Sequence, residues 1–169
     1  MLRTVLVANR GEIACRIIQT AKRVGLRTVA VYSEADSRAR HVEMADEAVN
    51  IGPAPVAESY LNPDRILDAA RSSASDAIHP GYGFLSENAA FARACETAGV
   101  IFVGPHVHTI ETMSDKAQAK QIAEQAGVPV LDGIHSEDQS VTGLVSNGTT
   151  LGFPLIIKPV SGGGGKGMH

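Results

Sequence analysis

The fold is decided by the stretch TVLVANRGEI, residues 4–13. Its first five residues form a short apolar run, which is typical of a buried strand, and the Asn-Arg-Gly that follows indicates a loop. From Gly11 to Val24 the apolar residues recur at intervals of three and four, which predicts an amphipathic helix that ends at Gly25. Strand, loop and helix in this order indicate an α/β fold.

The same order of elements continues along the chain. Short apolar runs predict four further strands, at residues 28–32, 48–51, 76–79 and 100–103. Three further helices are predicted: a short one within residues 33–46, one that begins at residues 62–64, and one from about residue 87 to residue 98. Strands that alternate with helices at this spacing predict a doubly wound, largely parallel sheet.

The organisation changes after about residue 110. A compact helix is predicted over residues 116–126, and a new strand is expected at residues 128–130. Residues 132–152 are polar, and Gly143 and Gly148 weaken any helix there, so we expect little helical structure before a last strand at residues 155–158. We therefore predict two domains, residues 1–112 and an incomplete second domain at residues 113–169.

Composition and charge exclude several classes of function. The chain of 169 residues carries a net charge of −3, with a pI near 6.0, which argues against a nucleic-acid partner and against a membrane surface. It contains no apolar run of membrane-spanning length, and its start does not look like a signal peptide. We therefore expect a cytoplasmic protein, or a mitochondrial one if a targeting segment has been removed.

Cysteines and histidines give no indication of a metal site. Cys15 and Cys95 lie far apart in the sequence and form no Cys-x-x-Cys pair, so neither a zinc site nor a redox dithiol is expected. His106 and His108 are two residues apart and would face different ways on a helix, whereas His41 and His135 stand alone.

The strongest functional signal is the stretch KPVSGGGGKG, residues 158–167. Glycines allow successive backbone N–H groups to turn toward one anion, and Lys158 and Lys166 add compact positive charges, so this loop is predicted to hold polyphosphate. A P-loop is excluded because Val160 stands where glycine is needed and Gly167 where a hydroxyl would bind magnesium. A flexible linker is a weaker interpretation, because two lysines bracket the glycines directly after a predicted strand.

A second candidate is HPGYGFLSEN, residues 79–88, between a predicted strand and a predicted helix. One interpretation is a Pro-Gly turn in which Ser86 caps the next helix and Glu87 lies in its first turn. The other is a loop that lines a ligand cleft, with the ring of Tyr82 and two glycines, Gly81 and Gly83, allowing close approach. Residue types alone favour neither interpretation.

Two further stretches give weaker signals. The turn at residues 9–13 has one glycine, so a dinucleotide fingerprint is absent, and a tight turn with Glu12 near the helix N-terminus is the favoured interpretation. Ser114 or Asp115 is expected to cap the helix in which Lys116 occupies the first turn. A cation there opposes the helix dipole by about 0.3–1 kcal/mol, so an anionic partner would compensate it, although a surface lysine is the commoner explanation.

Taken together, these stretches resemble the biotin carboxylase family, the ATP-dependent component of biotin-dependent acyl-CoA carboxylases. The resemblance runs from residue 4 to the end of the chain. The matching stretches are residues 8–14, 45–48, 51–55, 59–62, 78–88, 102–105, 115–116 and 157–158, together with the glycine loop. Val160 and the run of four glycines are more similar to the methylcrotonyl- and propionyl-type carboxylases than to the acetyl type, whereas Pro159 and His169 depart from the common pattern.

The resemblance implies a reaction in two steps. ATP and bicarbonate form carboxyphosphate, and the carboxyl group then passes to biotin on a carrier domain or subunit. The implied cofactors are ATP, Mg²⁺ and biotin, and the implied partners are the biotin carboxyl carrier and the carboxyltransferase. The implied fold is a Rossmann-like pre-ATP-grasp domain with a parallel sheet, followed by the start of an ATP-grasp domain.

The resemblance also implies roles for individual residues. Lys116 and Lys158 match positions that contact the nucleotide, and Gly164, Gly165 and Lys166 match the loop that folds over its phosphates. Tyr82 and Gly83 match the turn that faces the biotin end of the cleft. Arg16 matches a position at the dimer contact of the family, so a homodimer is one implied assembly, although Gln19 and Arg23 differ from some members there.

The catalytic residues of the family do not match any position here. Its magnesium-binding glutamates, its bicarbonate-binding arginine and its general base lie beyond the position of residue 169. We therefore expect residues 1–169 alone to be catalytically inactive and to bind ATP weakly or not at all. Two alternatives stay open: a non-enzymatic dimerisation or regulatory module derived from this family, and another ATP-grasp ligase, such as a carbamoyl-phosphate synthase or an enzyme of purine biosynthesis.

Overall fold

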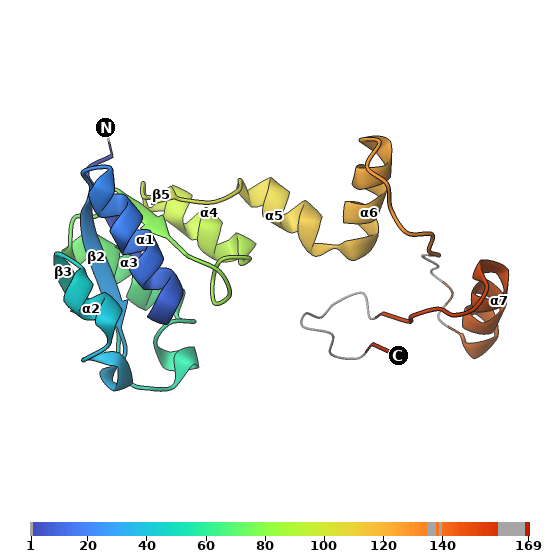
Figure 1. Cartoon of the computed structure of the whole chain (residues 1–169), viewed down its shortest axis with the longest axis horizontal. Coiled ribbons are helices and arrows are strands. Elements are labelled where there is room, and N and C mark those ends of the chain that lie inside the picture. Colours follow the sequence, from blue (N-terminus) through green and yellow to red (C-terminus); the bar gives the residue numbers. More distant parts are fainter. Residues whose placement is uncertain (1, 135–137, 139, 159–167) are drawn as a thin grey trace. The chain divides into compact units, whose positions relative to one another are not determined.

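The structure is a computed structural model that describes residues 2–134, 138, 140–158 and 168–169 (Figure 1). It divides into two compact units, Met1–Ile110 and Glu111–His169. The boundary expected from the sequence, between residues 112 and 113, lies inside helix α5 (Val107–Ser114). Each unit is described separately.

The first unit is built on a five-stranded sheet. The strands are β1 (Thr4–Val7), β2 (Arg27–Tyr32), β3 (Glu47–Asn50), β4 (Ala77–His79) and β5 (Ile101–Phe102). Their order is β3-β2-β1-β4-β5, and all four neighbouring pairs are parallel. In the centre of the sheet, Val5 of β1 is in register with Thr28 of β2 and with Ala77 of β4. The predicted parallel sheet is confirmed.

Four helices cover both faces of this sheet: α1 (Gly11–Arg23), α2 (Arg40–Met44), α3 (Pro63–Ser72) and α4 (Ala89–Thr97). On one face, Leu6 packs in a buried cluster with Ile66 of α3 and Phe91 of α4. On the other face, Val7 packs in a second cluster with Ile17 of α1. Alternate residues of β1 therefore point to opposite helical layers, which is the doubly wound arrangement that the sequence predicts.

The beginning of α4 differs from the prediction. Asn88 caps this helix, because its side-chain Oδ1 accepts a hydrogen bond of 2.9 Å from the backbone N–H of Phe91. Ser86, the cap in one of the two interpretations of this stretch, lies two residues earlier, where its backbone N–H donates to the carbonyl of Gly83. The expectation that Ser86 is the cap was therefore wrong, since the chain between Gly83 and Asn88 is folded into turns before the helix starts.

The second unit is helical in the part that the structure describes. It contains the end of α5, followed by α6 (Lys116–Gln125) and α7 (Val141–Leu151). Neither strand expected here, at residues 128–130 and 155–158, is found among the described residues. Ile157 and His169 instead exchange a single pair of backbone hydrogen bonds, of 2.8 and 3.0 Å.

Helix α7 was not predicted, because two glycines interrupt its sequence. Local hydrogen bonds support it. The hydroxyl of Ser140 accepts from the N–H of Gly143 at 3.1 Å, which is a standard N-cap. The hydroxyls of Thr149 and Thr150 donate to the carbonyls one turn earlier, at 2.8 and 3.0 Å. Among the described residues, no helix is both long and apolar enough to cross a membrane.

Candidate functional site

The candidate site lies in the first unit, at the edge where the parallel strands have their carboxyl ends. The loops after β1, β2 and β4 meet at this edge, and they carry Asn9, Asp36 and the turn of residues 79–88. In open α/β sheets this edge is where ligands bind.

Asn9 joins the first of these loops to the third. Its side chain is buried, and its Nδ2 donates hydrogen bonds of 2.8 Å both to the carbonyl of Pro80 and to the carbonyl of Tyr82. Its Oδ1 accepts a hydrogen bond of 2.9 Å from the backbone N–H of Arg10. One amide group thus ties two carbonyls of the turn to the end of β1.

Gly81 makes this close approach possible. Its φ is +69°, and a Cβ at this position would lie 2.7 Å from Nδ2 of Asn9. The backbone N–H of Gly81 also donates to Nδ1 of His79 at 3.1 Å. Burial lowers the pKa of His79, and the positive charge of Arg16 lowers it further, which favours a neutral ring with an acceptor nitrogen.

Arg10, Asp36 and Tyr60 form a second cluster beside Asn9. Oδ2 of Asp36 accepts hydrogen bonds from the Tyr60 hydroxyl at 2.8 Å, from the Ser33 hydroxyl at 3.0 Å and from the Arg10 guanidinium at 3.2 Å. Burial raises the pKa of Asp36, but these three donors together outweigh burial and lower the pKa below its usual value. Burial is also the main reason that the pKa of Tyr60 is raised, so its hydroxyl stays a proton donor.

The cluster holds the far end of the turn through an aromatic ring. The rings of Phe84 and Tyr60 stack with centroids 5.2 Å apart and planes 8° apart. The Arg10 guanidinium lies 5.4 Å from the Tyr60 centroid and 5.7 Å from that of Phe84, so it contacts both rings. Phe84 has a φ of +44°, an uncommon conformation for a residue with a side chain.

Tyr82 and Gly83 lie between the hydrogen bonds of Asn9 at one end of the turn and the stacked ring of Phe84 at the other. The Tyr82 side chain is 63% exposed, and a Cβ on Gly83 would meet no atom within 4 Å. The structure therefore brings these two predicted site residues together in one turn with a fixed backbone and an open outer surface. Such a surface suits a ligand-facing loop, and this role of Tyr82 and Gly83 stays a prediction.

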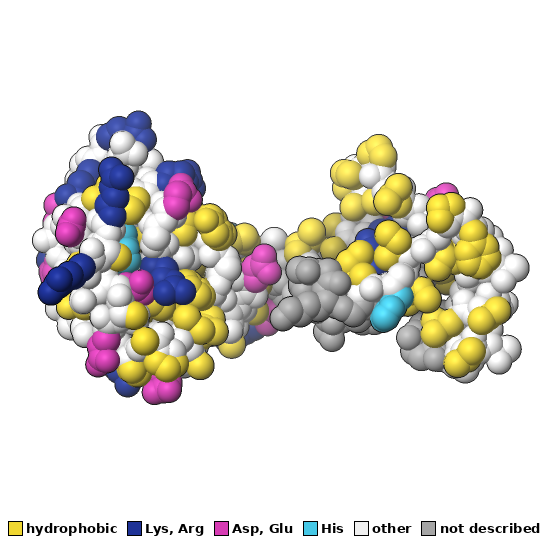
Figure 2. Space-filling model, turned by 60° about the horizontal axis from the view of Figure 1, so that its bottom comes forward, with side chains coloured by type: hydrophobic (Ala, Val, Ile, Leu, Met, Phe, Trp, Pro, Cys, Tyr) yellow, Lys and Arg dark blue, Asp and Glu magenta, His cyan; other side chains and the backbone are white. Residues whose placement is uncertain are grey.

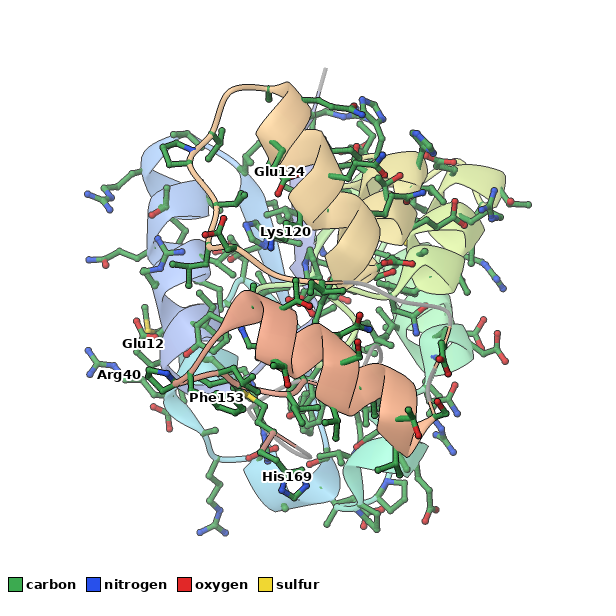
Figure 3. All side chains as sticks on the ribbon, turned by 90° about the vertical axis from the view of Figure 1, so that its right-hand side faces the viewer. Glu12, Arg40, Lys120, Glu124, Phe153 and His169 are labelled. Atoms are coloured by element: carbon green, nitrogen blue, oxygen red, sulfur yellow. The ribbon has the colours of Figure 1, made fainter. Side chains whose placement is uncertain are left out.

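The other predicted residues belong to the second unit. Lys116 is the first residue of α6 and is exposed. Asp115 caps this helix as expected, since its Oδ1 accepts from the N–H of Gln118 at 3.0 Å, whereas the hydroxyl of Ser114 donates to the carbonyl of Glu111. Figure 3 shows Lys120 and Glu124 further along the same helix.

Lys158 is exposed in the extended segment that follows α7. Gly164, Gly165 and Lys166 lie outside the described residues, so their predicted contact with phosphate stays a prediction. Among the residues that the structure does describe, no group of three or more His, Cys, Asp or Glu side chains could hold a metal ion.

Sequence reasoning missed Asn9, Arg10 and Asp36 as parts of the site. Asn9 is the first polar residue after a buried strand, and this position was the available signal. Apart from the backbone N–H of Arg10 next to Asn9 and the hydroxyl of Ser33 near Asp36, the partners of these three side chains lie 24 to 73 residues away in the chain, and no local pattern connects them.

An open parallel sheet whose carboxyl edge holds a fixed, glycine-containing turn is typical of ligand-binding α/β domains. Residues 1–110 match the family described as biotin carboxylase, N-terminal domain, and residues 115–169 match the carbamoyl-phosphate synthase L chain, ATP binding domain. The chain therefore belongs to the biotin carboxylase family, as its sequence motifs predict.

Similar proteins of known function are subunits of biotin-dependent carboxylases. The methylcrotonoyl-CoA carboxylase subunit alpha of Mus musculus, a mitochondrial protein, is 56% identical over 165 residues, which are 98% of this chain and 23% of that protein. The propionyl-CoA carboxylase alpha chain of Ruegeria pomeroyi is 51% identical over 169 residues, which are 100% of this chain and 25% of that protein. The chain thus spans about a quarter of the length of these relatives.

Two solved structures share the fold closely. Biotin carboxylase from Campylobacter jejuni, in a complex with β-γ-ATP, is 43% identical with a TM-score of 0.95 over 100% of this chain and 38% of that one. The biotin carboxylase domain dimer of 2-oxoglutarate carboxylase from Hydrogenobacter thermophilus, in complex with MgADP, ADP and bicarbonate, is 49% identical with a TM-score of 0.92 over 100% of this chain and 37% of that one.

Proposed function

We propose that this chain forms the amino-terminal part of an ATP-dependent biotin carboxylase within an acyl-CoA carboxylase. The whole enzyme uses ATP and bicarbonate to form carboxyphosphate and then carboxylates biotin on its carrier domain or subunit. The observation that carries this proposal is that both parts of the chain match, residues 1–110 as the biotin carboxylase N-terminal domain and residues 115–169 as an ATP-binding domain.

In this proposal the site residues divide between the two substrates. Lys116 and Lys158 contact the nucleotide, and Gly164, Gly165 and Lys166 close over its phosphates. Such groups suit phosphoryl transfer, which depends on positioning and on neutralising charge. The ligands of Mg²⁺ are supplied from outside residues 1–169. The solved complexes of relatives with β-γ-ATP and with MgADP and bicarbonate support this choice of ligands.

Tyr82 and Gly83 face the biotin end of the cleft. The exposure of the Tyr82 ring supports this role, because a ring that is 63% exposed on a fixed turn is available to pack against a bicyclic ligand. The carried biotin and the carboxyltransferase are the proposed partners, with no nucleic acid and no membrane among them. A homodimer through Arg16, which is exposed on α1, is supported by the dimer described for the Hydrogenobacter thermophilus domain.

Methylcrotonyl-CoA and propionyl-CoA are the proposed acyl substrates of the complete enzyme, since these name the carboxylases of the similar relatives. A cytoplasmic location stays a prediction, and several of the relatives are mitochondrial by name.

The test measures ATP cleavage by the natural protein that carries this sequence, with bicarbonate and biotin each omitted in turn. We expect cleavage to require both. Tyr82→Ala should raise the KM for biotin and leave the KM for ATP unchanged, whereas Lys116→Ala should raise the KM for ATP. Arg71→Ala is the matched control, because Arg71 is exposed on α3 and pairs only with the exposed Asp68 among the ion pairs of the described residues.

Cleavage that ignores biotin and bicarbonate would refute the biotin carboxylase assignment and favour another ATP-dependent enzyme, whereas no cleavage at all would favour a non-enzymatic module. The inactivity expected of residues 1–169 alone is tested separately, by calorimetric titration with MgATP. Micromolar binding to the 169-residue chain would contradict that expectation.

A further inference from the structure

We propose that Asn9 is a positioning residue that holds the turn of residues 80–84 in the one conformation that presents Tyr82 and Gly83 to a ligand. The identity of that ligand, the ring end of biotin, rests on the proposed function. The positioning itself rests only on contacts within the first unit.

The hydrogen-bonding capacity of the Asn9 amide is used within the protein. Both N–H groups of Nδ2 are donated, one to Pro80 and one to Tyr82, and Oδ1 accepts from Arg10. The side chain is 3% exposed, so water cannot replace these partners. The orientation is also fixed, because a flipped amide would direct an oxygen at two carbonyl oxygens.

The turn that Asn9 holds contains several left-handed residues. Gly81, Gly83 and Phe84 have φ values of +69°, +66° and +44°, so three of the five residues 80–84 are left-handed. The two glycines adopt this conformation readily, whereas Phe84 has a side chain and keeps it only where surrounding contacts over-determine the backbone. Asn9 supplies contacts to the first half of the turn, and the packing of the Phe84 ring on Tyr60 and Arg10 supplies them to the second half.

Between the contacts of Asn9 and those of the Phe84 ring, the outer surface of the turn is exposed. The backbone carbonyl of Tyr82 is fixed by Asn9 while its ring is exposed, and Gly83 is open on its outer side. A ligand that binds here does not have to order the backbone, and binding is favoured when that ordering is already complete. Loss of the Asn9 side chain would therefore weaken ligand binding at Tyr82, although Asn9 itself makes no contact with the ligand.

Other side chains cannot replace the amide at this position. Aspartate has the same shape and keeps the acceptor for Arg10, but it lacks both N–H donors. A larger side chain would be forced against Gly81, where the space is already so limited that an added Cβ would lie 2.7 Å from Nδ2 of Asn9. Asn9→Asp is therefore the sharpest variant, and Asn9→Ala is the second.

The first experiment measures amide hydrogen exchange of the 169-residue chain by mass spectrometry. Asn9→Asp and Asn9→Ala should speed exchange in residues 81–88 by about tenfold or more, with exchange in α1 and β2 unchanged, since two hydrogen bonds to the turn are lost. Gly81→Ala should speed exchange in the same residues, because its Cβ clashes with Asn9. In the double variant Gly81→Ala/Asn9→Ala, the free-energy change for opening the turn should be smaller than the sum of the changes in the two single variants.

Gly99→Ala is the matched control for backbone strain. Gly99 has a φ of +71°, close to that of Gly81, but a Cβ there would meet no atom within 4 Å. It should leave exchange in residues 81–88 unchanged. Unchanged exchange in the Asn9 variants, or an increase spread evenly over the first unit, would overturn the proposal.

The second experiment measures steady-state kinetics of the natural carboxylase that carries this sequence. Asn9→Asp should raise the KM for biotin by about tenfold or more and leave the KM for ATP unchanged, and Gly99→Ala should change neither. A loosened turn with an unchanged KM for biotin would overturn the ligand-presenting role. If Tyr82→Ala also leaves the KM for biotin unchanged, the proposed function at this turn fails, and the exchange data still decide whether Asn9 positions it.

Discussion

One carboxylate oxygen of Asp36 accepts three hydrogen bonds at the carboxyl edge of the sheet. The donors are Tyr60, Ser33 and Arg10, and the side chain is 19% exposed. Asp36→Asn removes the negative charge. Even with the amide oxygen at the position of Oδ2, the hydrogen bonds from Tyr60, Ser33 and Arg10 are no longer made to a charged acceptor and become weaker. We expect the free energy of unfolding to fall by about 1–2 kcal/mol, measured by urea denaturation at pH 7.

The control for this change is Asp68→Asn. Asp68 forms an ion pair with Arg71 at the surface of α3, with side chains 68% and 64% exposed. A pair this exposed contributes less than about 0.5 kcal/mol. An equal loss of stability in both variants would contradict the view that burial makes the hydrogen bonds of Asp36 stronger than the exposed ion pair of Asp68 with Arg71.

Asp36 also predicts how stability responds to acid. Its pKa is lower in the folded chain than in the unfolded chain, so its contribution is complete above a pH of about 3.9 and is lost as the pH falls through the folded value. Asp46 acts in the same direction, since hydrogen bonds from Lys22 and Thr28 lower its pKa to about 2. Stability should therefore fall below about pH 4, and Asp36→Asn should lessen that fall in urea titrations between pH 4 and pH 2. An unchanged slope in the variant would exclude Asp36 as a source.

His41 predicts a second pH effect, in the weakly acidic range. Its ring is fully buried, Nε2 lies 3.2 Å from the carbonyl of Val31, and Nδ1 has no partner among the described residues. Burial lowers the pKa of His41, and the charge of Arg10 lowers it further, while Val31 and the charge of Asp36 raise it. The unfolded chain therefore binds this proton more readily, and stability should decrease as the pH falls below about 6.5.

His41→Gln should remove part of this decrease, because glutamine does not titrate. The measurement is the urea midpoint of both proteins at intervals from pH 7.5 to pH 5. Some pH dependence should remain in the variant, since burial lowers the pKa of His79 as well. A variant with the full wild-type slope would show that His41 is not its source.

At the scale of single elements, the start of α4 gives a direct choice between two caps. The side chain of Asn88 accepts from the first turn of the helix, whereas Ser86 is the cap in one of the two interpretations of the sequence. Asn88→Ala should lower the free energy of unfolding by about 1 kcal/mol, and Ser86→Ala should lower it by no more than a few tenths. Urea denaturation of both variants distinguishes them, and the reverse ranking would restore the original prediction.

The elements of the first unit were predictable because burial reinforces their periodicity. In β1 every residue is buried, and α1 and α3 each bury one apolar stripe, so the pattern in the sequence is the pattern of the core. In α7 no residue is buried, and the side-chain contact that stabilises its start is the N-cap of Ser140. Hydrogen bonds of this kind leave only a weak signal in the sequence, which is why two glycines led to the wrong prediction.

The candidate site was predictable only in its exposed half. Glycines beside an aromatic residue after a strand identified Tyr82 and Gly83 as a turn. The buried half depends on contacts across the sheet, such as those of Asn9 with Pro80, 71 residues later. The sequence order of strands predicts that these loops share an edge, but it does not predict which side chains meet there.

At the scale of the whole molecule, the two units differ in how much they bury. The first unit contains four clusters of buried hydrophobic residues. In the second unit, no described residue from Glu111 onward is buried, and Leu131, Phe153 and Val141 are 87%, 80% and 79% exposed. Figure 2 shows hydrophobic side chains, in yellow, over one face of that unit.

This difference predicts that cooperative unfolding belongs to the first unit. Burial of apolar surface is the main term that offsets the loss of chain entropy, and the described part of the second unit buries no side chain fully. A chain of residues 1–114 should therefore unfold at the same urea midpoint as residues 1–169, and amides of α6 and α7 should exchange far faster than those of β1 and β2. A lower urea midpoint for residues 1–114, or slow amide exchange in α6 and α7, would mean that the second unit contributes a core of its own. Only buried contacts can make the helices of that unit unfold together with the sheet.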